Sequence, residues 1–424
     1  MQAIHVDSFK ALKPSLSSSD ELRRARVTRE LNLKKLKRYK NFITHRDVEK
    51  EDPEEIMEAI IGDVEMLEVD ENNNTEQQNV IKPKWVKFLF SKNVFDQLAA
   101  TERIYRVLHR NLEQAVKEII SQGLVERLFE LVQSNQNQRL KSKASLVLTE
   151  VTTYDVRDAL PSNIVEAIEN LLEFSPYDVK EQAVAIFGNI VGDSSKLRDL
   201  FLQSRVWFQL LKLLDESPSR TMLCYGTFAL SNLCYEMNSS ADFSIISQCL
   251  PLLARFIHHE DEEVISCSCW ALSFLCVGSV EAVIEAGVCL RLVELLSFRW
   301  SNKILSSTLH VIGQIAAGTE SHAQVVIDCN ALPALHALLH HNKSEIVQET
   351  SWIISNILAG SESQIQAVID ANLYPALLKL LHNSNNKTQL EAAWAIRQSI
   401  SRKRTSLLQI EYFVSVGYIE NLCK

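Results

Sequence analysis

Trp352-Ile-Ile-Ser-Asn356-Ile-Leu-Ala-Gly360 is the stretch that decides the fold, because related stretches return along the chain. In five of the seven a Trp, a Phe or a small residue stands four positions before a residue that is often Asn, and the two weaker members have Leu146 and His310 there. The second member of the pair falls at positions 150, 189, 232, 274, 314, 356 and 398, which are 39 to 43 residues apart. A repeat of this length indicates a stack of similar units that share one continuous core.

Gly287, Asn330 and Asn372 mark a second recurring phrase, for example Ala367-Val-Ile-Asp-Ala-Asn372-Leu-Tyr-Pro-Ala-Leu-Leu. Gly and Asn tolerate the left-handed conformation that ends a helix, so the phrase predicts a short first helix that stops there. An apolar second helix follows, with Pro tolerated in its first turn. The period is that of armadillo or HEAT units. We therefore expect an all-α fold, an armadillo-repeat right-handed superhelical solenoid with a flexible N-terminal basic segment.

Composition agrees with a helical protein. Only 11 Gly and 9 Pro interrupt 424 residues, and 46% of the chain is hydrophobic. The N-terminus lacks the apolar run of a secretory signal, and no stretch approaches the roughly 20 apolar residues of a membrane helix. We expect a soluble intracellular protein without a membrane contact. The nine cysteines are scattered without metal-ligand or redox spacing, so buried thiols are expected and neither a metal nor a cofactor.

Charge divides the chain into segments. Residues 21–46 hold ten Lys or Arg against two acids, and residues 47–76 hold thirteen acids against one Lys, within a net charge of −9. An acidic body favours cationic partners over nucleic acid. The boundaries that we expect are a flexible N-terminus (1–20), a basic helix (21–48), an acidic linker (49–84) and a repeat array (85–424) of about seven repeats with the start of an eighth.

The Trp-x-x-x-Asn pairs indicate a binding surface. Residues four apart share one helix face, so the pairs of successive repeats align into ladders on the concave surface. An Asn amide hydrogen-bonds a peptide backbone irrespective of sequence, and Lys or Arg stems fit between indole planes. A single Trp in an apolar helix is more often a packing residue. The periodic Asn favours binding, because Asn does not stabilise the interior of a helix.

The body resembles the armadillo domain of importin-α, most specifically at 181–194, 270–296 and 324–359. The N-terminal runs Leu22-Arg-Arg-Ala-Arg26 and Leu33-Lys-Lys-Leu-Lys-Arg38 are similar to the importin-β-binding segment of that family. The resemblance implies a non-enzymatic adaptor that shuttles between cytoplasm and nucleus. Its expected partners are importin-β and cargo proteins with Lys/Arg-rich nuclear-localisation signals.

The resemblance also implies site residues. At the larger cargo site they are Asn189, Asp193, Phe228, Asn232 and Trp270. At the smaller cargo site they are Gln314, Glu320, Trp352, Asn356, Glu391, Trp394 and Gln398. For importin-β binding they are Arg23, Arg24, Arg26, Leu33, Lys34, Lys35, Lys37, Arg38 and Arg46.

Departures from the family concentrate at the larger site. Ala185 and Phe228 stand where the family has Trp, and Leu146 and Glu150 replace the first Trp and Asn. The smaller site departs only at Gln398, so we expect it to contribute unusually much to cargo binding. The chain ends at Lys424 inside what resembles an eighth repeat, which puts binding of an export receptor in doubt.

Other function classes find less support. An enzyme is not expected, because the chain has no G-x-S-x-G, P-loop, G-x-G-x-x-G or H-E-x-x-H motif. The pairs His258-His259 and His340-His341 lack spaced partners and indicate solvated turns rather than a metal site. The alternative that remains open is an armadillo scaffold or assembly chaperone without import activity, which the substitutions Ala185 and Phe228 favour.

Overall fold

The computed structural model describes residues 79–134, 137–216, 218–235, 240–382, 385–399 and 407–415. Over these residues the regular structure consists of α-helices with short 3-10 helices and contains no strand, as predicted. They divide into a first unit, which runs to residue 119 and includes residues 153–155, and a second unit that holds the rest. Within the same ranges, no helix combines the length and the apolar character needed to cross a membrane.

The predicted N-terminal segments 1–20 and 21–48, and the linker up to residue 78, lie outside the described residues. The end of the predicted linker needs adjustment, because a helix already begins at Pro83 rather than after residue 84. Proline suits that position, since the first residue of a helix needs no N–H donor.

The first unit is a small helical body built from α3 (Pro83–Leu89), α4 (Val94–Arg110) and most of α5 (Leu112–Ser121). The side chain of Asn93 caps α4 by accepting a hydrogen bond from the N–H of Phe95 at 3.0 Å. The backbone N–H groups of Val80 and Ile81 donate to the carboxylate of Glu118, at 3.0 and 2.7 Å. These contacts hold the segment before α3 against α5.

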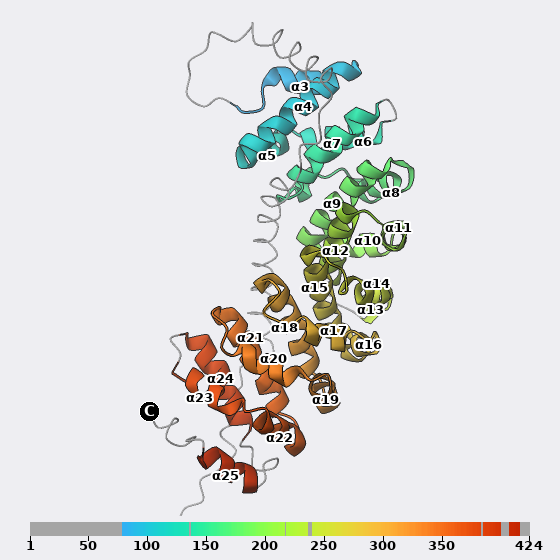
Figure 1. The fold of residues 1–424 in the computed structure, drawn as a ribbon. Coiled ribbons are helices and arrows are strands. Elements are labelled where there is room, and N and C mark those ends of the chain that lie inside the picture. Colours follow the sequence, from blue (N-terminus) through green and yellow to red (C-terminus); the bar gives the residue numbers. More distant parts are fainter. Residues whose placement is uncertain are drawn as a thin grey trace, which may run out of the picture. The chain divides into compact units, whose positions relative to one another are not determined.

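The second unit is a series of repeats of up to three helices each, as the sequence predicts. The third helix of each repeat, which we call a ladder helix, packs beside the ladder helix of the next repeat (Figure 1). The ladder helices are α7 (Gln138–Val151), α9 (Tyr177–Asp193), α12 (Arg220–Cys234), α15 (Glu262–Gly278), α18 (Asn302–Ala316), α21 (Ser344–Leu358) and α24 (Asn386–Gln398).

Shorter helices precede each ladder helix. The first helices are α10 (Ser195–Leu202), α13 (Ser240–Ile246), α16 (Val280–Glu285), α19 (Glu320–Asp328) and α22 (Glu362–Asp370). The second helices are α6 (Leu124–Gln133), α8 (Ile164–Phe174), α11 (Arg205–Asp215), α14 (Leu250–Phe256), α17 (Cys289–Glu294), α20 (Ala331–Leu338) and α23 (Tyr374–Leu380). The 3-10 turns η2 (Arg157–Ala159) and η3 (Ser247–Cys249) lead into α8 and α14, and α25 (Leu407–Ser415) follows α24.

The turn between first and second helices has the predicted geometry. Gly287, Asn330 and Asn372 have φ angles of +74°, +61° and +56°, so all three adopt the left-handed conformation. Gly123, at φ +67° before α6, adopts the same conformation in the first repeat, where the sequence pattern did not predict the turn. The predicted stop of the first helix is confirmed at these turns.

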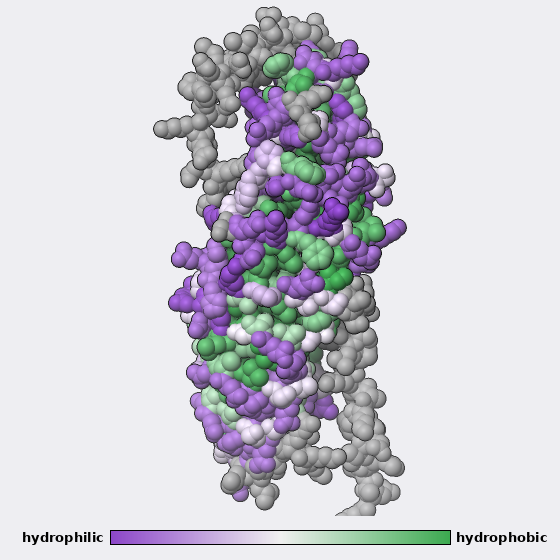
Figure 2. Space-filling view, turned by 90° about the vertical axis from the view of Figure 1, so that its right-hand side faces the viewer, coloured by the Kyte–Doolittle hydropathy of each residue, from purple (hydrophilic) through white to green (hydrophobic). Residues whose placement is uncertain are grey.

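The core runs through the ladder helices. On α15 every residue from Val264 to Cys276 is buried, because ladder helices cover it on both sides and α14 packs against it. The short helices form the opposite side, and in Figure 2 that side shows apolar side chains among hydrophilic ones. Leu200, Phe208 and Leu290 are among the exposed apolar residues of α10, α11 and α17. The expected continuous core is thus present in the second unit.

We expect Asn330→Ala to lower the free energy of unfolding by about 1 kcal/mol, because a β-carbon is unfavourable at positive φ. Asn330→Gly should change it by less than about 0.5 kcal/mol, since Gly adopts this conformation freely. Chemical denaturation measures both variants. Asn302→Ala, at the helical and exposed start of α18, is the control and should be nearly neutral; an equal loss there would contradict the assignment.

Candidate functional site

The predicted pairs all lie on ladder helices, at equivalent positions. Phe228 and Asn232 are on α12, Trp352 and Asn356 on α21, and Trp394 is on α24. Because the ladder helices pack side by side, the first members of the pairs form one row across the second unit. We call this row the ladder face, together with the residues three and seven positions before it and four positions after it on the same helices.

The ring of a ladder residue lies on the preceding ladder helix. A β-carbon on Gly313 of α18 would collide with the indole of Trp352 on α21. A β-carbon on Gly188 of α9 would lie 3.1 Å from the Phe228 ring on α12. Each glycine stands one residue before the second member of its own pair, and we call this position the shelf. The absence of a side chain at these two shelves makes room for the aromatic ring.

The other central shelves hold serine. Ser231, Ser273 and Ser355 occupy the equivalent positions, and all three are buried. The hydroxyls of Ser231 and Ser273 donate to the carbonyls of Phe228 and Trp270, three residues earlier on the same helix, at 2.9 and 2.8 Å. A hydroxyl that bonds to its own helix needs no outside partner. A small side chain at the shelf is therefore a feature of the five central ladder helices, from α9 to α21.

Aromatic side chains are concentrated at the middle of the row. The ring of Trp270 stacks on Phe274 with centroids 6.1 Å apart and contacts His310 of α18 at 5.1 Å. Tyr235, just after α12, meets Phe274 edge to face at 5.2 Å. Farther along the row, the guanidinium of Arg397 lies 4.8 Å from the Trp394 ring centroid. This last contact shows that the exposed indole face already accepts a cation.

The amides are less uniform than the sequence suggests. The Nδ2 of Asn232 donates to the carbonyl of Gly188 at 2.7 Å, and that of Asn189 donates to Thr152 Oγ1 at 3.1 Å and the Thr149 carbonyl at 3.3 Å. These two amides therefore join neighbouring ladder helices. The Nδ2 of Asn356 is buried and has no hydrogen-bond partner. An unpaired buried donor is costly, so this amide favours an added acceptor.

The predicted acids occupy two places. Asp193 is the last residue of the ladder helix α9, and Glu320, the first residue of α19, follows the C-terminal end of the ladder helix α18. Glu391 is on α24 three residues before Trp394, and Glu349 has the equivalent place before Trp352 on α21. Glu349 also lies 3.9 Å from His310 Nδ1. Gln314 and Gln398 are half-buried members of their pairs on α18 and α24.

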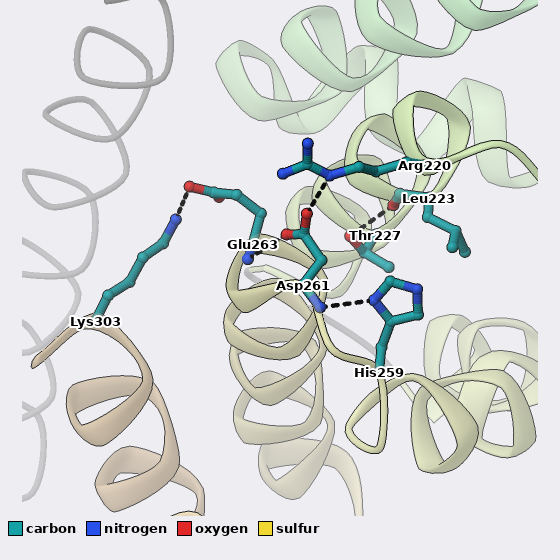
Figure 3. A network of polar contacts seen from close by, with 7 residues as sticks. All are labelled: Arg220, Leu223, Thr227, His259, Asp261, Glu263 and Lys303. Atoms are coloured by element: carbon teal, nitrogen blue, oxygen red, sulfur yellow. Dashed lines mark hydrogen bonds and ion pairs between the residues drawn. The ribbon is translucent and has the colours of Figure 1, made fainter. Parts of the chain in front are cut away.

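The N-terminal ends of the ladder helices are joined by polar contacts, which Figure 3 shows for α12, α15 and α18. Arg220 Nε lies 2.6 Å from Asp261 Oδ2, and Lys303 forms an ion pair with Glu263. Asp261 also accepts from the N–H of Glu263 and caps α15. Burial raises the pKa of the Asp261 carboxyl, but the Arg220 and backbone hydrogen bonds outweigh it and leave this pKa below its ordinary value. The carboxylate is therefore charged at neutral pH.

The cysteines among the described residues form no reactive site. Seven of the eight described thiols are buried, and Cys329 is half-buried. Burial raises the pKa of Cys269 and Cys276 to about 12 and that of Cys289 to about 11, so these thiols are protonated at neutral pH. No group of three metal-ligating side chains occurs in the described ranges. His258 and His340 lie in turns, as expected.

The residues predicted to bind importin-β, from Arg23 to Arg46, lie outside the described residues. Two features of the described residues were not predicted from the sequence. One is the shelf, which is readable as a Gly or Ser directly before each central pair member. The other is the bonding of Asn189 and Asn232 to the preceding helix, for which the sequence holds no signal.

Comparison with known proteins agrees with this architecture. The family model of the armadillo/beta-catenin-like repeat matches residues 319–359 and 361–398. The family model of the importin beta binding domain matches residues 6–102, which extends through α3 into α4. Among solved structures, an engineered protein is similar with a TM-score of 0.71 at 23% identity, over 80% of this chain and 82% of that one. A designed armadillo repeat protein in complex with the peptide (KR)4 has a TM-score of 0.52 at 24% identity, over 56% of this chain and 100% of its own.

The curated relatives are importin subunits. Importin subunit alpha-1a of Oryza sativa subsp. japonica is 38% identical over 266 residues, which are 61% of this chain and 50% of that protein. Importin subunit alpha-1 of Schizosaccharomyces pombe is 36% identical over 284 residues, 66% of this chain and 51% of that protein. Importin subunit alpha-8 of Arabidopsis thaliana is 34% identical over 58% of this chain and 56% of its own. The chain therefore spans about half the length of the curated relatives it matches.

We expect Gly313→Ala to lower the free energy of unfolding by about 1–2 kcal/mol. Displacing the Trp352 ring costs about 1–3 kcal/mol, which exceeds the roughly 1 kcal/mol that Ala gains over Gly in a helix. Gly188→Ala is the matched control and should be nearly neutral, because the contact with Phe228 is milder. Chemical denaturation compares the two, and a stabilising Gly313→Ala would refute the shelf.

Proposed function

We propose that this chain, a divergent relative of the importin α subunits, is a nuclear import adaptor. It binds Lys/Arg-rich nuclear-localisation peptides along the ladder face and joins them to importin-β through residues 21–48. Such an adaptor moves between cytoplasm and nucleus with its cargo, and it needs no catalytic group. The observation that carries the proposal is the row of rings from Phe228 to Trp394 on consecutive, side-by-side helices.

The row suits cationic side chains for a physical reason. Rings that repeat every helix leave slots between them, and a Lys or Arg stem fits such a slot with its charge directed outward. The contact of Arg397 with Trp394 is an intramolecular example of the same interaction. Glu349 and Glu391 lie within one turn of Trp352 and Trp394 and supply the opposite charge. The peptide backbone supplies the acceptor that Asn356 Nδ2 lacks.

Two peptide sites of unequal strength follow. At the smaller site, α21 and α24 keep both indoles, both acids and the amide of Asn356. At the larger site Trp270 remains, but Ala185 and Leu146 supply no ring to α9 and α7. A missing ring costs about 0.5–2 kcal/mol, so the affinity of that site falls by roughly tenfold for one or two missing contacts. The smaller site is thus the principal one.

Binding to importin-β is supported by the family model that covers residues 6–102 and by the ten cations among residues 21–46. A basic helix is suited to an acidic protein surface. The second candidate function is an armadillo scaffold or assembly chaperone that lacks import activity. Ala185 and Leu146 favour that candidate, because they remove the rings of two successive repeats.

We expect Trp352→Ala to weaken binding of a Lys-rich peptide at least tenfold, and Trp270→Ala to weaken it less, because the principal site surrounds Trp352. Fluorescence anisotropy of a labelled peptide measures both affinities. Both indoles are largely buried, so thermal unfolding must show that the variants fold. The matching Leu variants, which keep more volume, provide the control. A much larger loss at Trp270 would contradict the assignment of the principal site.

We expect reversing Lys34, Lys35, Lys37 and Arg38 to Glu together to abolish capture of importin-β in a pull-down. The same protein should still bind the Lys-rich peptide, because these residues lie outside the ladder face. Reversing Arg205 and Lys212, exposed cations of α11, provides the control and should leave capture intact. Peptide binding without importin-β capture by the unaltered chain would favour the scaffold over the adaptor.

A further inference from the structure

The first ladder helix differs in charge from those that follow. On α7, Arg139, Lys143, Leu146 and Glu150 are spaced by four, three and four residues, so they share the helix face that carries the ladder row. Arg139 is exposed and Lys143 half-buried. The two positions that hold acids on α21 are therefore cationic on α7.

On α21 these places have the opposite sign. On α21 the places of Arg139 and Lys143 are taken by Glu345 and Glu349, of which the first is exposed and the second half-buried. On α24 the first place is Lys387 and the second is Glu391, so only α21 carries acids at both places. An extended ligand across these helices therefore meets two cations beside Glu150 on α7, two carboxylates on α21 and one on α24. Such a surface favours a ligand whose own charge changes sign along its length.

The α7 end of the row also lacks the slots between rings that favour lysine stems. Leu146 of α7 and Ala185 of α9 stand at the ring positions, and Ala185 is 3% exposed. A cationic side chain at α7 has no ring to stack on and meets two like charges. A carboxylate at the same place meets two opposite charges. The preference of α7 is thus opposite to that of Trp352 and Trp394.

We propose that the ladder face of α7 binds acidic residues of the same peptide whose basic cluster occupies α21 and α24. This inference rests on the proposed function and specifies its ligand as an extended peptide with a basic cluster and, at a fixed distance, an acidic one. Nucleic acid fits worse, because its phosphates are attracted to α7 but repelled by Glu349 and Glu391.

The distance between the two clusters follows from helix packing. Packed helices lie about 8–10 Å apart and an extended peptide advances about 3.4 Å per residue, so one ladder helix corresponds to roughly three peptide residues. Five steps separate α7 from α21 along the order α7, α9, α12, α15, α18 and α21. The acidic cluster therefore lies about 12 to 15 residues from the basic one.

The experiment uses the full chain and (Lys-Arg)4 peptides that carry a Gly-Ser spacer and a terminal Asp-Glu-Asp. The matched peptides end in Ser-Ser-Ser, and spacers of about 5 and about 13 residues are placed on either end of the core. We expect the acidic end to tighten binding roughly two- to tenfold on one end only and only with the long spacer. The gain should shrink at high salt, since exposed pairs are screened.

Charge reversal locates the effect. The variant Arg139→Glu with Lys143→Glu should remove the gain from the acidic end and leave the Ser-ended peptide unchanged or slightly tighter. Arg139→Lys with Lys143→Arg should keep the gain. The control variant Arg205→Glu with Lys212→Glu makes the same change in charge on α11, away from the ladder face, at two positions seven residues apart. It should also keep the gain in affinity.

Three results would overturn the inference. In the first, the acidic end of the peptide never tightens binding. In the second, the gain in affinity survives reversal of Arg139 and Lys143. In the third, a single-stranded oligonucleotide binds the unaltered chain and no longer binds the variant with both residues reversed. If the (Lys-Arg)4 core does not bind at all, the proposed function fails instead. The two failures are thereby distinguished.

Discussion

The seating of an aromatic ring on a residue with little or no side chain in the preceding ladder helix is the contact on which the rest depends. Where the ring of Trp352 meets Gly313, two helices pack at the distance that the backbone allows. The same contact turns each ring to a fixed angle. This one contact therefore determines both how the repeats stack and how the rings are presented, and a larger residue at the shelf would disturb both.

Charged side chains occur in two places on this stack of helices, between neighbouring helices and across the ladder face. Between helices, Arg220 with Asp261 and Lys303 with Glu263 join the N-terminal ends of three ladder helices. The Asp261 carboxylate is largely buried and Lys303 and Glu263 are half-buried, so the cost of desolvation offsets much of the attraction and the pairs contribute little net stability. Across the ladder face, the sign changes from Arg139 and Lys143 to Glu349 and Glu391. Packing therefore holds the frame, and under the proposed function the charges select the ligand.

The sequence predicted the repeat length, the all-helical fold and the left-handed turns at Asn330 and Asn372, because periodicity and backbone preference are local properties. It also placed Trp352 and Trp394 on equivalent helices. It did not predict that Asn189 and Asn232 bond to the preceding helix, since that depends on the exact approach of two helices. The start of the first helix at Pro83 was missed by two residues, which is an ordinary uncertainty of helix ends.

The central claim is that lysine stems of a peptide lie between the rings of the ladder face. NMR of a Lys-rich peptide with labelled lysine side chains, bound to the full chain, tests it most directly. Ring currents of Trp352 and Trp394 should shift the methylene protons of at least one lysine strongly upfield. Bound lysine methylenes at their solution shifts would contradict the account, because the side chains would then be held by charge alone, away from the indoles.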